Sequence, residues 1–209
     1  VRASLNDADP EIRTAALRAL ANWKTPDVAP DLFKLAQSTS NPSERLLCLR
    51  AYLGWAANSE LPASRRLDLC REAAPVLQQP EEKKLLLAAL GNLKSLEGLA
   101  LIAPHLDSAA TREEAAAATV ATAAELLKGD QAAPAAPKLV APLQKATTAA
   151  NADLANRAKE LLAQAQQKAG PQYFRGTPRR IPRSGGRRGR ACPLASPPPV
   201  RYVRHNLEL

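Results

Sequence analysis

Apolar residues recur at three- and four-residue spacing from Pro10 to Leu162, and no long stretch alternates with a period of two. This spacing places apolar side chains on one face of a helix, so it predicts helices and no strands. Pro10, Pro42 and Pro80 each open an apolar stretch. A proline suits the first turn of a helix because its backbone angle is already helical and its missing N–H is not needed there. We therefore expect helices that begin at these three prolines.

The first apolar stretch is repeated along the chain. Residues 7–23 (DADPEIRTAALRALANW) and 39–55 (TSNPSERLLCLRAYLGW) lie thirty-two positions apart and are identical at six positions. A third copy, PEEKKLLLAALGNL at 80–93, follows after a further thirty-eight positions, and Ala-rich helices are expected near 111–127, 137–146 and 151–166. Helix pairs with a period of about 30–50 residues are typical of an α-solenoid, in which each pair buries its apolar face against its neighbours.

The segment DADPEIRTAALRAL at 7–20 resembles the second helix of a HEAT repeat. The HEAT pattern is an Asp, a short gap, an aliphatic residue followed by Arg, and then Ala and Leu at helical spacing. Asp7, Ile12, Arg13, Ala16 and Leu20 occupy these positions. The resemblance extends over roughly residues 1–168 by the repeat period. It implies hydrogen-bonded ladders between successive repeats at the Asp and Arg positions.

The later copies keep the basic position of this pattern but not the acidic one. Arg45 and Lys83 align with Arg13, whereas other residues stand in place of the Asp. We therefore predict that these three basic residues either contact a partner or bridge successive repeats. Arg18 and Arg50 are expected on the flank of the same helices.

Large apolar side chains also recur at one position of the repeat. Trp23, Trp55 and Leu93 occupy the same place in the three copies. Equivalent positions of a repeat are expected to be equally buried, so we predict that these residues anchor the repeat core. The alternative is an exposed pair of tryptophans on a concave face, where they would hold a peptide or stack on a base.

Together these patterns predict an all-α protein that folds as a right-handed α-α superhelix, a HEAT-like or armadillo-like solenoid of about four and a half helical hairpins. We expect the repeat domain over residues 1–169, with a first repeat truncated on its N-terminal side. Residues 170–209 are expected to be a disordered tail rich in Arg, Pro and Gly. The chain begins at Val1 and contains no Met, and we expect it to be a fragment of a longer protein.

The segments RLLCLRAYLGWA and EEKKLLLAALGNLKSLEGLALIAPHLD also resemble the HEAT segments of large multidomain bacterial proteins. In those proteins such segments adjoin sugar-dehydrogenase-like propellers, cytochrome c modules or 3-keto-disaccharide hydrolase domains. This resemblance implies a scaffold within an exported protein, and without it a soluble cytoplasmic chain is the default expectation. No apolar run reaches the roughly 20 residues of a membrane-spanning helix, so we expect no membrane insertion.

The net charge of +9 is unevenly distributed. Residues 1–170 hold 20 Lys and Arg against 19 Asp and Glu, whereas residues 171–209 hold nine Arg against Glu208. The nearly neutral body disfavours nucleic-acid binding by the helices. The tail has three interpretations: a disordered basic segment, a product of out-of-frame translation, or an Arg-rich segment that binds nucleic acid. In the last case the contacts would come from Arg179, Arg180, Arg187 and Arg188.

Few residues suggest catalysis. His105 and His205 are the two histidines, and neither belongs to a His-Glu-x-x-His metal motif. The sequence has no Cys-x-x-Cys pair, no Gly-x-Ser-x-Gly elbow and no glycine-rich loop in the body that would hold a phosphate. We therefore predict no catalytic residues, no metal and no cofactor.

The sequence thus favours a non-enzymatic scaffold that holds a partner protein or an adjacent domain of the same polypeptide. Two alternatives stay open. Some DNA glycosylases for alkylated bases resemble HEAT solenoids and use Trp and Asp on a basic concave face. An Arg-rich tail, in turn, binds RNA through its phosphates. Because the body is nearly neutral, we expect nucleic acid to be bound through the tail if it is bound at all.

Overall fold

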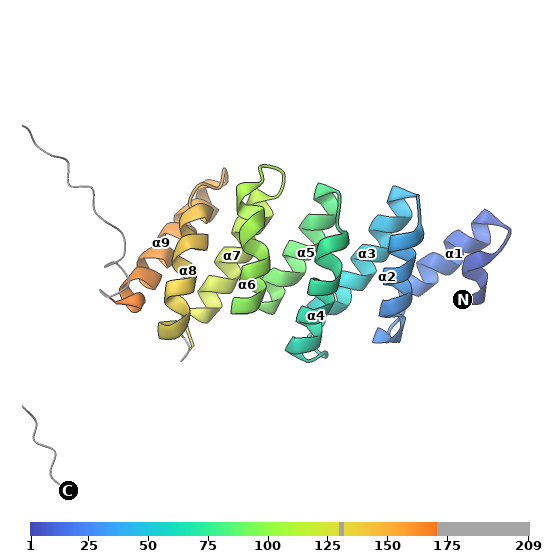
Figure 1. Ribbon diagram of the computed structural model, residues 1–209, viewed down its shortest axis with the longest axis horizontal. Helices are drawn as coiled ribbons and strands as arrows, with labels where there is room; N and C mark the ends of the chain where they lie inside the picture. Colours follow the sequence, from blue (N-terminus) through green and yellow to red (C-terminus); the bar gives the residue numbers. More distant parts are fainter. Residues whose placement is uncertain (130–131, 171–209) are drawn as a thin grey trace, which may run out of the picture. The chain divides into compact units, whose positions relative to one another are not determined.

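The computed structural model describes residues 1–129 and 132–170, and this part of the chain is all helical (Figure 1). The prediction of an all-α chain without strands is confirmed for these residues. Its nine α-helices are α1 (Pro10–Ala21), α2 (Ala29–Ser38), α3 (Pro42–Ala57), α4 (Ala63–Ala73), α5 (Pro80–Leu93), α6 (Leu96–Ile102), α7 (Arg112–Leu126), α8 (Ala132–Ala146) and α9 (Ala152–Ala169). Four 3-10 turns accompany them: η1 (Ala3–Asn6), η2 (Pro26–Val28), η3 (Ala74–Val76) and η4 (Ala103–Asp107).

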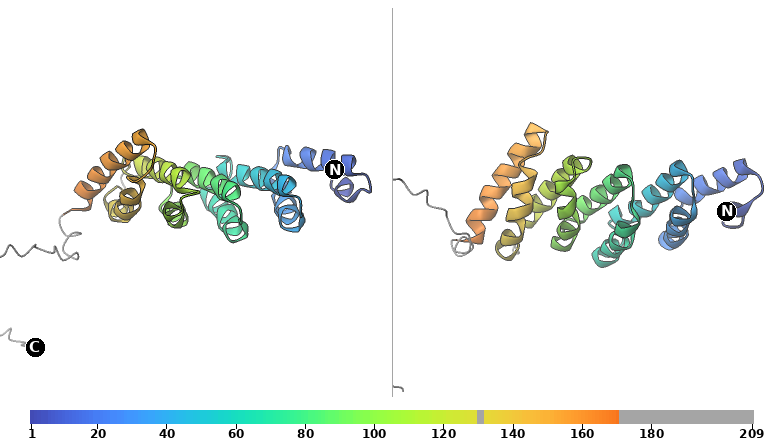
Figure 2. Two further views of the ribbon diagram at one scale, coloured as in Figure 1. Left: turned by 90° about the horizontal axis from the view of Figure 1, so that it is seen from above. Right: turned by 45° about the horizontal axis from the view of Figure 1, so that its top comes forward.

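The helices form two rows, as in a helical solenoid (Figure 2). The odd-numbered helices make one row, in which α3 packs on α1, α5 on α3, α7 on α5 and α9 on α7. The even-numbered helices make the other row, and each forms a hairpin with the odd-numbered helix that follows it. The four hairpins and the single helix α1 match the predicted four and a half hairpins.

The helices begin where the prolines predict. Pro10, Pro42 and Pro80 are the first residues of α1, α3 and α5. The side chains of Asp9 and Asn41 accept hydrogen bonds from main-chain N–H groups of the first turn, at 2.8 and 3.0 Å. These caps satisfy donors that have no partner within the helix, so each start is fixed by local chemistry.

Buried leucines run through the odd-numbered row. Leu17, Leu49 and Leu87 stand at equivalent positions of α1, α3 and α5, with 6%, 0% and 0% of their surface exposed. They belong to one apolar cluster that extends from α1 to α9, while a second cluster lies among α6 to α9. Burial raises the pKa of the Cys48 thiol to about 11 and that of Cys70 to about 12, so both thiols serve as small core residues.

Helix α8 differs from the sequence prediction, because it begins at Ala132 and not near Pro137. Pro137 and Pro142 both lie inside it. An interior proline removes a donor and leaves the carbonyl four residues earlier without its partner. Those carbonyls belong to Ala133 and Lys138, which are both exposed, so water can donate to them instead. The helix therefore tolerates prolines that would break a buried one.

The predicted tail, from residue 171 onward, lies outside the described residues. Within residues 1–129 and 132–170, no helix has both the length and the apolar character needed to cross a membrane.

We expect Leu87→Ala to lower the free energy of unfolding by about 2–5 kcal/mol, because it leaves a cavity in the row that joins α3, α5 and α7. Ile12→Ala is the matched control: Ile12 is 44% exposed, and the same kind of truncation is expected to cost about 1 kcal/mol. Urea denaturation followed by circular dichroism at 222 nm measures both. Equal losses in the two variants would contradict the assignment of the core.

Candidate functional site

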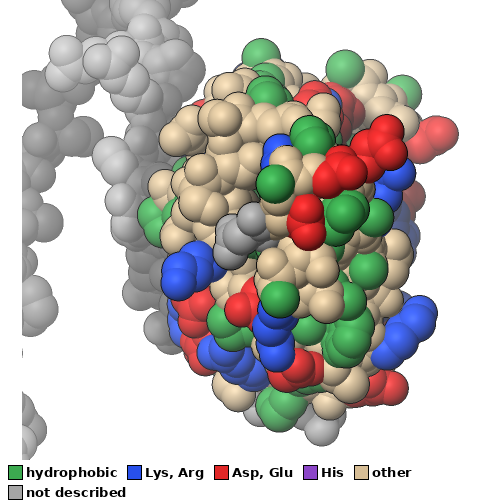
Figure 3. Space-filling view, turned by 90° about the vertical axis from the view of Figure 1, so that its right-hand side faces the viewer, with side chains coloured by type: hydrophobic (Ala, Val, Ile, Leu, Met, Phe, Trp, Pro, Cys, Tyr) green, Lys and Arg blue, Asp and Glu red, His purple; other side chains and the backbone are tan. Residues whose placement is uncertain are grey.

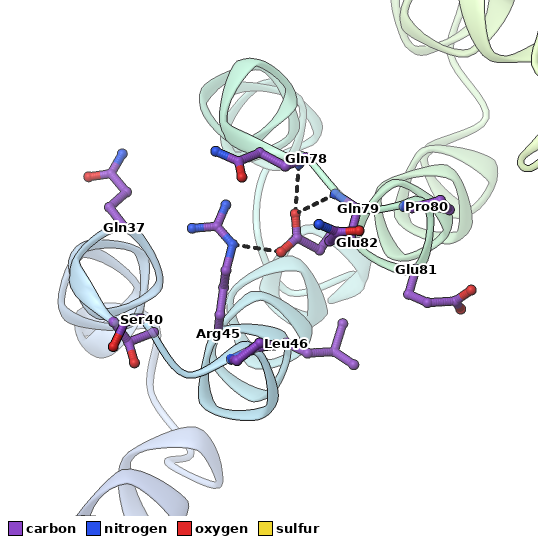
Figure 4. A pocket seen from close by; sticks show the side chains of 11 residues that line it. Gln37, Ser40, Arg45, Leu46, Gln78, Gln79, Pro80, Glu81 and Glu82 are labelled. Carbon is purple, nitrogen blue, oxygen red and sulfur yellow. Dashed lines mark hydrogen bonds and ion pairs between the residues drawn. The ribbon is translucent and has the colours of Figure 1, made fainter.

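A cleft of about 620 Å³ opens between the repeat of α3 and the repeat of α5 (Figure 4). The end of α2 and the start of α3 line one side, and the segment that leads into α5 lines the other. Its wall combines apolar surface with five amide and hydroxyl side chains: Gln37, Thr39, Ser40, Gln78 and Gln79.

Arg45 lies on α3 at the floor of this cleft and joins three elements. Its Nε donates to Glu82 Oε1 on α5 at 2.6 Å. Its Nη1 donates to the main-chain oxygen of Ala36 on α2 at 2.6 Å, and its Nη2 donates to that of Val76 on η3 at 2.8 Å. Because three of its donors are used in this way, Arg45 connects its own repeat to the next.

Glu82 completes the floor from the other side. Its side chain is 4% exposed, and its Oε2 accepts from the main-chain N–H groups of Gln78 at 2.7 Å and Gln79 at 3.2 Å. Burial raises the pKa of the Glu82 carboxyl, but hydrogen bonds from Arg45 and from these two N–H groups lower it. The lowering effects prevail, so the pKa lies below its ordinary value and the carboxylate stays charged beside Arg45.

The other predicted basic residues make different contacts. Arg13 donates to the main-chain oxygens of Asp7 at 2.6 Å and Ala8 at 2.9 Å, within its own repeat. Lys83 lies near His105, where burial first and then the charge of Lys83 lower the pKa of the histidine. Arg13, Arg45 and Lys83 thus occupy equivalent helical positions without sharing one mode of contact.

The flanking arginines lie elsewhere on the surface. Arg18 on α1 and Arg50 on α3 are both exposed, and neither lines the cleft. Their role in partner binding stays a prediction. The tail residues Arg179, Arg180, Arg187 and Arg188 lie outside the described residues.

The prediction that Trp23, Trp55 and Leu93 share a core position is wrong for Trp23, which is 45% exposed. Trp55 and Leu93 are partly buried against the main apolar cluster. The difference arises because α1 ends at Ala21, before Trp23, whereas α3 continues to Ala57, beyond Trp55. Equivalence in sequence therefore did not give equivalent structure at this position.

Sequence reasoning missed two residues whose side chains join neighbouring elements. Glu82 was not singled out from the sequence, although it falls at the third position of α5, where a glutamate reaches back to the preceding N–H groups. Arg112 begins α7, and its Nε donates to the main-chain oxygen of Leu106 at 3.1 Å. It stands six residues after its acceptor, as Arg13 does after Asp7, and this spacing is the signal that was overlooked.

The described residues contain no group of three or more His, Cys, Asp or Glu side chains placed to hold a metal ion. The charged groups on the floor of the cleft are paired with each other, and the remaining wall is neutral apart from Glu81. The arrangement suits a ligand that offers uncharged donors and acceptors.

Comparison with known proteins connects this architecture to one family. The family model for HEAT repeats matches residues 1–63, which include α1, α2 and α3. The searches of curated proteins and of solved structures found no match.

We expect Glu82→Gln to lower the free energy of unfolding by about 3–5 kcal/mol, because it removes the partner of a charge that is itself largely buried. The double variant Arg45→Met/Glu82→Leu should recover a large part of that loss, since no unpaired charge remains. Glu81→Gln is the control: the Glu81 side chain is 66% exposed, and its loss is expected to cost about 0.5 kcal/mol or less. Chemical denaturation of the four proteins measures these differences, and a double variant no better than Glu82→Gln would contradict the pairing.

The lowered pKa of the Glu82 carboxyl predicts that the free energy of unfolding depends on pH. A carboxyl whose pKa is lowered by folding stabilises the protein above its unfolded pKa, and this contribution is lost as the pH falls through the folded pKa. The stability difference between the wild type and Glu82→Gln should therefore be constant above about pH 5 and shrink below the ordinary glutamate pKa of about 4.3. Urea titrations at pH 7, 5, 4 and 3 test this. A difference that is unchanged at pH 3 would be incompatible with the assignment.

Proposed function

Because the chain is built from HEAT repeats, we propose that it is a non-enzymatic scaffold whose cleft between α3 and α5 binds an extended segment of a partner protein. HEAT repeats are generally protein-interaction scaffolds and are typically non-catalytic. The finer proposal, that the cleft binds an extended peptide, rests on the polar and apolar groups that line the cleft.

An extended peptide presents main-chain N–H and C=O groups that have no partners of their own. Glutamine side chains offer both a donor and an acceptor, and Gln37, Gln78 and Gln79 line the cleft from two repeats. Pro42 and Pro80 add apolar surface for side chains of the bound segment. This combination of a few polar groups with apolar lining is typical of binding sites in proteins.

The charges of the cleft favour a peptide over nucleic acid. Arg45 is hydrogen-bonded to Glu82, and Glu81 adds a negative charge at the wall, so a phosphate would meet no unpaired cation among the lining residues. Nucleic-acid binding normally requires a one-sided positive surface. The nearly balanced charge of residues 1–170 disfavours the alternative that resembles a DNA glycosylase, and the alternative that involves RNA depends on the tail.

The proposal predicts which peptides the protein selects. A display library of random linear peptides, panned against the 209-residue protein, is expected to yield sequences of low net charge. The double variant Gln37→Ala/Gln78→Ala should bind them about tenfold more weakly, since each hydrogen bond contributes about 1 kcal/mol or less.

Gln164→Ala is the matched control, because Gln164 is an exposed glutamine on α9, far along the chain from the cleft. It should leave peptide affinity unchanged in the same fluorescence titration. Selected peptides that bind the cleft variant and the wild type equally, or a library that yields no binder, would refute the proposed site.

A further inference from the structure

A second pocket lies between α2 and α4, beside the cleft. Its volume is about 150 Å³, and its lining comes from α2, α3 and α4. In Figure 1, α2 and α4 are neighbours in the even-numbered row, and α3 lies behind them. Gln37 on α2 lines both this pocket and the cleft, so the two form one continuous groove. We call the smaller part of this groove the α2–α4 pocket.

The floor of the α2–α4 pocket is aromatic. Phe33 on α2 stacks on Tyr52 on α3 with ring centroids 4.8 Å apart, and Leu69 on α4 adds aliphatic surface. Tyr52 is 1% exposed, and its hydroxyl donates to Glu72 Oε2 on α4 at 2.9 Å. A cavity of about 150 Å³ accommodates a molecule the size of benzene. The pocket therefore has room for one side chain.

Two cations and one acid border this floor. Among residues 1–129 and 132–170, no ion pair or hydrogen bond engages the ammonium group of Lys34 on α2. Arg65 on α4 lies 3.6 Å from Glu72 Oε1, which is close enough for an ion pair but too long for a hydrogen bond. The N–H donors of Arg65 are thus available to another acceptor. With two positive charges and one negative charge, the lining has a net charge of +1.

The acids about one helical turn from these two cations are paired elsewhere and do not neutralise them. Asp31 on α2 accepts a hydrogen bond from Arg2 Nε at 2.6 Å. Asp68 on α4 forms an ion pair with Arg71 at 3.5 Å. The pocket thus keeps a local excess of positive charge above an apolar floor. A group that complements both features has an apolar stem and a negatively charged end.

From this charge pattern we propose that the α2–α4 pocket receives one glutamate side chain of the peptide that occupies the cleft. This inference rests on the proposed peptide binding and adds a sequence requirement to it. The stem of the glutamate lies on Phe33, and its carboxylate accepts hydrogen bonds from Lys34 and Arg65. Such charge-assisted hydrogen bonds are stronger than neutral ones. A glutamate has a longer stem than an aspartate, so it buries more apolar surface on the floor.

The geometry of α2 sets where the glutamate stands in the peptide. Phe33 and Gln37 are four residues apart on one face of α2, which separates them by about 6 Å along the helix axis. An extended chain advances by about 3.3 Å per residue. The glutamate therefore stands about two residues from the peptide group that Gln37 binds.

The pocket suits a carboxylate of a protein better than the phosphates of a nucleic acid. A net charge of +1 is small beside the several phosphate contacts that nucleic-acid binding uses. Figure 3 views the end of the body that carries α1, and on that face Lys and Arg side chains lie among Asp and Glu side chains. The positive charge of the pocket is therefore local, as recognition of a single acidic residue requires.

The test uses the peptides selected from the random display library against the 209-residue protein. We expect them to share one glutamate at a fixed position. In a fluorescence titration, glutamine in place of that glutamate should weaken binding about tenfold, because the charge-assisted hydrogen bonds to Lys34 and Arg65 are lost. Raising the NaCl concentration from about 50 to about 500 mM should weaken the glutamate peptide more than the glutamine peptide.

Lys34→Glu reverses a charge of the pocket. This variant should bind the glutamate peptide about tenfold more weakly than the wild type does, and it should prefer a peptide with lysine in place of the glutamate. Lys159→Glu is the matched control, because Lys159 is an exposed lysine on α9 and its replacement changes the net charge equally. The control should leave both affinities unchanged. Both variants should keep the far-ultraviolet circular dichroism of the wild type, since both lysines are exposed.

Three results would overturn the inference: selected peptides without a shared acidic residue, equal affinities of the glutamate and glutamine peptides, or a loss with Lys34→Glu that Lys159→Glu reproduces. In each case, weaker binding by Gln37→Ala/Gln78→Ala would still support peptide binding in the cleft, so the two proposals fail separately. A library that yields no binder would refute both. Displacement of the peptide by an oligothymidylate of similar affinity would identify phosphate as the ligand and would also overturn the inference.

Discussion

The last carbonyl groups of each stacked helix have no hydrogen-bond partner within that helix. The carbonyl groups that lie between repeats also have limited access to water. The stack depends on donors that reach these groups from neighbouring elements. Arg45 donates to Ala36 and Val76, and Arg112 donates to Leu106. A guanidinium suits this task because it offers several donors in a fixed plane and stays charged. Leucine packing holds the helices together, whereas Arg45 fixes where one repeat meets the next and Arg112 joins α7 to the turn that precedes it.

This use of arginine also determines what the cleft can bind. Once Arg45 is engaged by two carbonyls and by Glu82, its charge is no longer available to an anion. The amides of Gln37 and Gln78 then provide the accessible polar groups of the wall. The contacts of Arg45 that hold two repeats together thus leave a cleft without an unpaired cation, which is why we favour a protein segment as its ligand.

The sequence predicted those features that depend on local chemistry. Pro10 and Pro42 begin helices because a proline restricts its own residue, and Leu49 is buried because helical spacing alone places it on the inner face. Trp23 was misjudged and Glu82 was not singled out, because their environments depend on structure beyond their own helix. Trp23 is exposed because α1 ends before it. Glu82 is buried in an ion pair because Arg45 approaches it from another repeat. Neither the end of α1 nor this ion pair can be recognised from a short stretch of sequence.

The linear arrangement of the repeats has a consequence for how the protein unfolds. Leu139, Leu143 and Leu161 belong to the cluster among α6 to α9, whereas Leu17 and Leu49 belong to the other. In a linear array, each unit is held by its immediate neighbours, so distant units share no direct energetic coupling. The α8–α9 hairpin can therefore open while the first repeats stay folded, as a local cooperative unit with its own free energy. Amide hydrogens at the two ends of the array then exchange on independent timescales.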